Sequence, residues 1–72
     1  MVPHLITALT GPIVRGDVLT VAAHLAALRS DAPNLLRAYR VAANVTLEAA
    51  LASGRLDREA GAKIAKLMED IE

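Results

Sequence analysis

The chain has no cysteine, tryptophan or phenylalanine, and Tyr39 is its only aromatic residue. Without cysteine it has no disulfides, no thiol catalysis and no Cys-ligated zinc. It also has no excess of either charge, because 8 Lys and Arg balance 8 Asp and Glu. Nucleic acids and anionic membranes favour a basic surface, so a neutral chain argues against both partners. No uncharged run reaches the roughly 20 residues of a membrane span.

The N-terminus lacks the basic region of a signal peptide, so we expect a cytoplasmic protein. The 72 residues predict one domain, spanning 1–72, and they include 15 Ala and 11 Leu. Alanine buries little apolar area, and in a chain this short the gain from burial roughly equals the cost of ordering the residues. We therefore expect the chain to gain stability by association, as a homo-oligomer (a dimer) or against another domain.

The apolar pattern predicts an all-α fold, because Val, Ile and Thr do not alternate with polar residues as they do in strands. We expect three main helices and a short N-terminal helix, together forming an associating helical bundle. The short helix is predicted over Pro3 to Leu9. Thr10-Gly11-Pro12 then indicates a break, and residues 11–16 are predicted as a loop.

Capping residues mark the three main helices. Asp17 is predicted to cap the first, which runs to about Leu28 or Arg29 and is apolar nearly all round, a pattern typical of a helix buried on several sides. The next is predicted from Pro33 to Ala52, where Ser53 and Gly54 end it. Asp57 is predicted to cap the last, which runs from Arg58 to about Asp70.

Each main helix has a predicted inward face at helical spacing. On the first of them it comprises Val18, Val21, Ala22, Leu25 and Leu28. On the next it comprises Leu35, Leu36, Tyr39, Ala42, Ala43, Thr46, Leu47 and Ala50. On the last it comprises Ala60, Ile64, Leu67, Met68 and Ile71. Gly61 lies within the last helix, where it costs about 1 kcal/mol relative to Ala. Either it allows a neighbouring helix to approach closely or it is simply tolerated there.

The common catalytic and cofactor motifs are not present. His4 and His24 do not form a metal-binding pattern, and we interpret His24 as a packed or hydrogen-bonded structural histidine rather than a ligand. Gly-rich phosphate loops are absent and no strand precedes any glycine pair, so this chain by itself is not expected to bind a dinucleotide. The nucleophile pattern G-x-S-x-G is absent too. We therefore predict no catalytic, cofactor-binding or metal-binding residue in the chain.

The segment from Thr10 to Asp17 is the densest in special residues, and two interpretations of it remain open. It is a helix connection with capping chemistry, which accounts for every residue except Arg15. Alternatively, Arg15 and the start of the following helix face a cleft, where a guanidinium and free N–H groups attract an anion. For Asp17 the capping role is the first interpretation.

The same segment carries a resemblance. The pattern A-L-T-G-P-x-x-R-G-D-x-x-T-x-x-x-H-L matches Ala8 to Leu25 at every fixed position. It resembles the C-terminal helical domain of an uncharacterised family of NADP-dependent oxidoreductases with an N-terminal Rossmann-like domain. Their layout is similar to that of ketopantoate reductase, pyrroline-5-carboxylate reductase and 6-phosphogluconate dehydrogenase. The resemblance extends over essentially the whole chain.

The resemblance implies that this chain is part of a dimerisation and substrate-cleft domain, inactive alone. It implies NADP for the full-length parent, whose Rossmann-like domain is not in this sequence. The matched polar residues Thr10, Arg15, Asp17 and His24 are the substrate-cleft candidates. A free-standing helical protein-interaction module is the alternative, and it explains the composition but not the motif. A helix-turn-helix DNA binder is disfavoured by the zero net charge.

Overall fold

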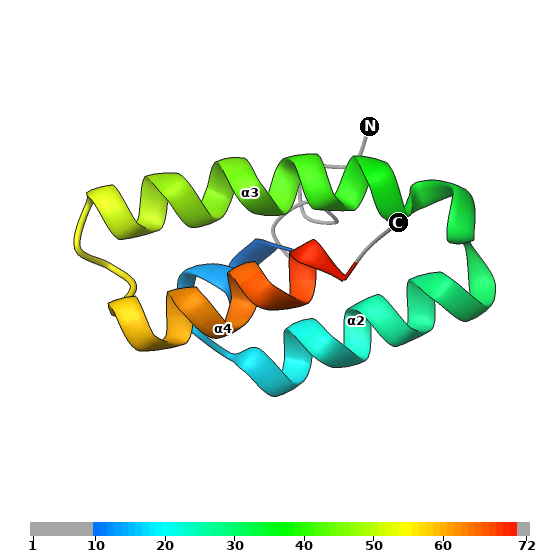
Figure 1. Cartoon of the computed structure of the whole chain (residues 1–72), viewed down its shortest axis with the longest axis horizontal. Helices are drawn as coiled ribbons and strands as arrows, with labels where there is room; N and C mark the ends of the chain where they lie inside the picture. The colour runs from blue at the N-terminus through cyan, green and yellow to red at the C-terminus, as the bar shows by residue number, and fades with distance from the viewer. Residues whose placement is uncertain (1–9, 71–72) are drawn as a thin grey trace.

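The structure is a computed structural model that describes residues 10–70, and within this range it is entirely helical, without strands (Figure 1). Its elements are α2 (Val18–Asp31), the 3-10 turn η1 (Pro33–Leu35), α3 (Leu36–Ala52) and α4 (Arg58–Glu69). Residues 10–14 are also helical. None of the helices in the described range is long and apolar enough to cross a membrane. The all-α prediction is confirmed.

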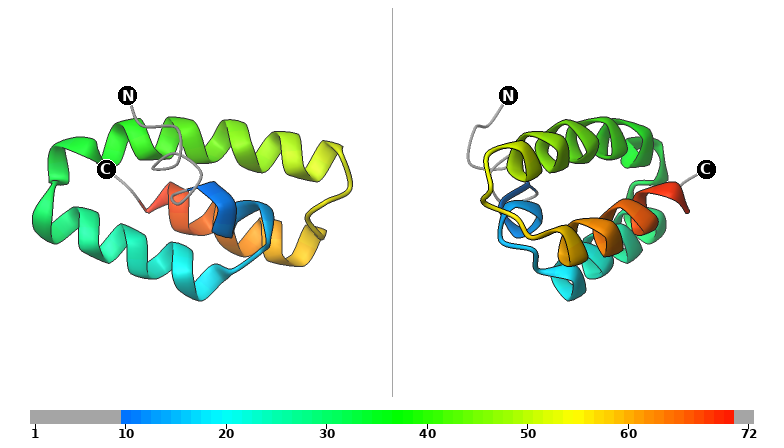
Figure 2. Two further views of the ribbon diagram at one scale, coloured as in Figure 1. Left: turned by 180° about the vertical axis from the view of Figure 1, so that it is seen from behind. Right: turned by 60° about the vertical axis from the view of Figure 1, so that its left-hand side comes forward.

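The helices enclose a single core. α3 runs antiparallel to both α2 and α4 (Figure 1), and the helical residues 10–14 lie on the other side of the bundle from α4 (Figure 2, right). The helical residues 10–14 and all three α-helices contribute to the core, whereas η1 has no buried residue. The core consists of Ile13, Val21, Leu25, Tyr39, Ala43, Leu47, Ala50, Leu56, Ile64 and Met68.

The predicted loop over residues 11–16 is wrong, because residues 10–14 are helical and the chain turns at Arg15 and Gly16. Gly16 has a φ of +69°, the left-handed conformation that ends a helix. The amide of Asp17 donates to the Pro12 carbonyl at 2.8 Å. The break therefore lies after the glycine–proline pair, where buried Ile13 holds the helical turn against the core. The short helix predicted over Pro3 to Leu9 lies outside the described residues.

The predicted burial of α2 on several sides is also wrong. Val21 and Leu25 are buried, but Leu19 is 83% exposed, and Ala23, Ala26 and Ala27 are exposed with it. The short chain has too few elements to surround a helix, since α3, α4 and η1 contact one side of α2 only.

The helix predicted from Pro33 begins with the 3-10 turn η1 and becomes α-helical at Leu36. Two residues predicted to face inward, Leu35 and Ala42, are exposed, and Val41 and Val45 are each 64% exposed. The inward face of α3 is thus narrower than predicted, because α4 and α2 cover only the side that carries Tyr39 and its helical neighbours.

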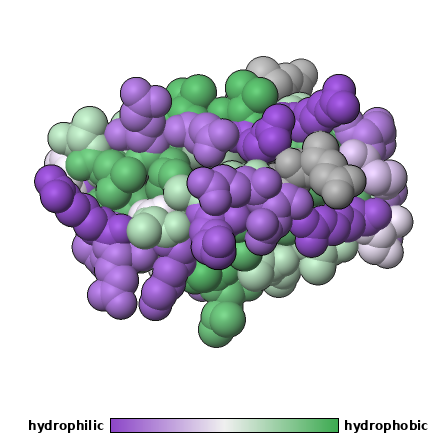
Figure 3. Space-filling view, viewed as in Figure 1, coloured by the Kyte–Doolittle hydropathy of each residue, from purple (hydrophilic) through white to green (hydrophobic). Residues whose placement is uncertain are grey.

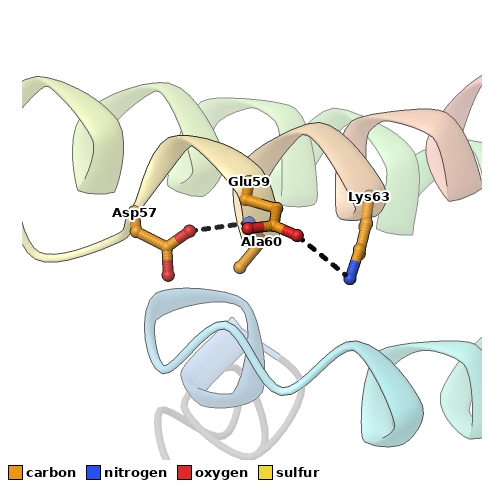
Figure 4. Close-up of polar contacts among 4 residues, drawn as sticks. All are labelled: Asp57, Glu59, Ala60 and Lys63. Carbon is orange, nitrogen blue, oxygen red and sulfur yellow. Dashed lines mark hydrogen bonds and ion pairs between the residues drawn. The ribbon is translucent and has the colours of Figure 1, made fainter.

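The connection between α3 and α4 follows the prediction closely. Gly54 has a φ of +78°, and the amide of Arg55 donates to the Ala50 carbonyl at 3.0 Å, which closes the end of α3. Asp57 caps α4 by accepting from the Ala60 amide at 2.8 Å (Figure 4). Inside α4, Gly61 is buried, and a methyl group there would lie 2.8 Å from a Leu51 methyl, so this glycine does permit close helix packing.

Candidate functional site

The four candidate residues lie in and next to the turn between the helical residues 10–14 and α2. We call this region the motif corner and define it as residues 10–17 together with Thr20 and His24. It contains most of the fixed positions of the sequence motif. The contacts in this region show which motif residues form caps, turns or packing contacts and which do not.

Asp17 caps α2, as predicted. One carboxylate oxygen accepts from the Thr20 amide at 3.2 Å, and the other accepts from the Thr20 hydroxyl at 2.7 Å. The hydroxyl bond is the largest cause of a lowered pKa for Asp17, followed by the bond from the amide, with smaller contributions from the charge of Arg15 and from His24. Both carboxylate oxygens are engaged in this cap, which makes Asp17 a structural residue of the corner.

Thr20 is the corner residue that the sequence interpretation did not select. Its hydroxyl and its amide both donate to Asp17, so these two motif positions form one capping unit. The signal was present in the sequence, because an N-cap aspartate followed three residues later by a side chain that can reach back to it is a helix-start pattern.

The two glycines of the corner also have structural reasons. A methyl group on Gly16 would lie 3.0 Å from Leu56 Cδ1 and 3.1 Å from Ala60 Cβ, so the turn packs directly on the start of α4. A methyl group on Gly11 would lie 3.1 Å from Nη1 of Arg15. The guanidinium of Arg15 therefore folds back over Gly11.

Arg15 and His24 differ from the other corner residues because their side chains have polar atoms without a hydrogen-bond partner in the described range. Arg15 is exposed, and within residues 10–70 its guanidinium makes no ion pair or hydrogen bond. His24 is half-buried, and its Nδ1 atom is fully buried without a hydrogen-bond partner in the structure. A buried polar nitrogen without a partner is uncommon in folded proteins and calls for an explanation. The hydrogen-bonded interpretation of His24 therefore does not hold for Nδ1.

Thr10 is half-buried at the start of the described range and completes the set of four. The structure brings Arg15 and His24 close enough to Asp17 to affect its pKa, so one corner carries an exposed cation, a capped carboxylate and an imidazole. Such a corner could bind an anion through Arg15. No group of three or more potential metal ligands occurs in the described part of the chain.

A second feature is a shallow apolar groove of about 420 Å³ between the helical residues 10–14 and the second half of α3. Its lining residues are Val14, Val45, Thr46, Ala49, Ala50, Ser53 and Arg55. Because Val45 is 64% exposed, the groove opens onto the exposed side of α3. It is an open apolar hollow rather than a closed pocket.

The fold and the motif corner define a small helical domain with a capped helix start and two polar side chains left without partners. Residues 3–46, more than half of the chain, match the family model described as a domain of unknown function, DUF2520. The chain belongs to this family, a C-terminal helical domain associated with Rossmann-like proteins. Neither a curated protein nor a solved structure shows significant similarity to the chain.

Proposed function

We propose that this chain is the C-terminal dimerisation and cleft-forming domain of an NADP-dependent oxidoreductase and is inactive alone. One observation carries the proposal. The guanidinium of exposed Arg15 and the Nδ1 atom of half-buried His24 make no hydrogen bond within the described part of the domain. The family to which the chain belongs supports it, since that domain accompanies Rossmann-like proteins. On this proposal, Thr10, Arg15 and His24 line a cleft that is completed by the Rossmann-like domain.

In this role the corner does not perform hydride transfer. Asp17 and Thr20 fix the start of α2, and Gly11 gives the Arg15 side chain room to lie across the turn. Arg15 would bind an anionic group of the substrate through its planar, permanently charged guanidinium. His24 is half-buried, and the exposed part of its ring would contact the substrate or the adjoining domain.

The first test is to sequence the DNA upstream of the Met1 codon at the native locus, over roughly the 200 codons that a Rossmann-like domain and further helices require. An open frame that encodes a strand followed by G-x-G-x-x-G supports the proposal. A stop codon just upstream of Met1, with no neighbouring Rossmann-like gene, contradicts it.

The second test is binding. We expect isothermal titration calorimetry of the isolated chain with NADPH to give no saturable heat, because the cofactor site belongs to the other domain. With the Rossmann-like protein supplied in trans, Arg15→Ala should weaken substrate binding and leave NADPH binding unchanged. Arg55→Ala, which removes another exposed arginine, is the matched control. Saturable NADPH binding by the isolated chain would contradict the proposal.

A second function, a free-standing helical interaction module, is favoured by one observation. Large apolar side chains are exposed on both α2 and α3, including Leu19, Val41 and Val45. Such surfaces mark protein interaction sites. A stable complex with a partner that has no Rossmann-like domain, isolated by affinity purification and identified by mass spectrometry, would support this second function over the first.

A further inference from the structure

We draw no further inference here: the strongest candidate, the exposed apolar side of α2 with Leu19 and Ala23, which is green along the lower edge of Figure 3, carries none because nothing in the described part of the structure shows what covers it.

Discussion

At the scale of single residues, most of the motif is explained by helix starts and turns rather than by chemistry. Asp17 and Thr20 form one cap, Gly16 supplies a left-handed turn, and Gly11 leaves room for a guanidinium. What remains is the guanidinium of Arg15 and the Nδ1 atom of His24, which have no partner in the described part of the chain. Most positions of the motif therefore specify the fold. The few positions that the fold does not require are the candidates for a binding site.

Gly16→Ala should lower the free energy of unfolding by more than Gly54→Ala does. Both glycines have left-handed backbones, with φ of +69° and +78°, which cost alanine about 1–2 kcal/mol each. Only Gly16 also packs against neighbours, Leu56 and Ala60, whereas nothing lies within 4 Å of a methyl group at Gly54. Urea unfolding followed by circular dichroism measures both variants. Equal losses would show that the packing of the turn on α4 contributes nothing.

The helix cap at Asp17 should make the thermal stability of the chain decrease at acid pH. Its hydrogen bonds with Thr20 lower its pKa below the ordinary value of 3.8. The stabilisation is therefore fully present above that value and is lost as the pH falls through the lower pKa of the folded state. We expect the parent chain to lose more thermal stability than Asp17→Asn between roughly pH 5 and pH 2. Thr20→Val should reduce the difference, and identical acid profiles for the parent chain and Asp17→Asn would contradict the role of the cap.

At the scale of elements, the boundaries predicted from capping residues agree with the structure wherever the signal is local. Asp17 precedes α2, Asp57 precedes α4, and Gly54 follows α3. The surface ion pair of Glu59 with Lys63, 3.8 Å apart one turn along α4 (Figure 4), contributes little beside these caps. The boundary at Gly11 and Pro12 was wrong, because the buried neighbour Ile13 kept that segment helical. A glycine–proline pair does not by itself show whether a helix ends there, because buried neighbours can keep the segment helical.

The packing of α3 on α4 can be tested with a double-mutant cycle. Gly61→Ala gains about 1 kcal/mol of helix propensity, but the new methyl group would lie 2.8 Å from a Leu51 methyl. In the parent chain we expect the two effects nearly to cancel. In a Leu51→Ala background the contact is gone, so Gly61→Ala should stabilise by about the full 1 kcal/mol. Additive effects in urea unfolding would show that α3 and α4 do not approach closely at Gly61.

At the scale of the whole molecule, the chain leaves apolar surfaces uncovered on two sides. Leu19 and its exposed alanine neighbours lie on α2, and exposed Val41 and Val45 lie on α3, beside the groove with Val14. A chain of 72 residues buries only about 60% of its unfolded surface. Association is an ordinary way to cover such surfaces, and it stays the prediction drawn from the alanine content.

Thermal unfolding should report this association. The melting temperature of the parent chain should rise with protein concentration, because dimerisation stabilises the folded state by mass action. Leu19→Lys should remove this dependence without lowering the melting temperature at the lowest concentration, since Leu19 is 83% exposed in the single chain. Calorimetry or circular dichroism at several concentrations measures both effects. A melting temperature independent of concentration in the parent chain would contradict self-association.

The sequence by itself determined the helical class, the helix starts at Asp17 and Asp57 and the stop at Gly54, because caps and left-handed glycines act through backbone groups within a few residues. Only the tertiary structure decided which sides of α2 and α3 are covered. Alanine and valine give a helix no strong preference for one face, so burial there depends on where α4 and η1 come to lie. The same holds for the motif corner. The motif located it, but only the cap at Asp17 and the packing of Gly16 on α4 separated its structural residues from the Arg15 guanidinium and the His24 Nδ1 atom, which have no partner in the described range.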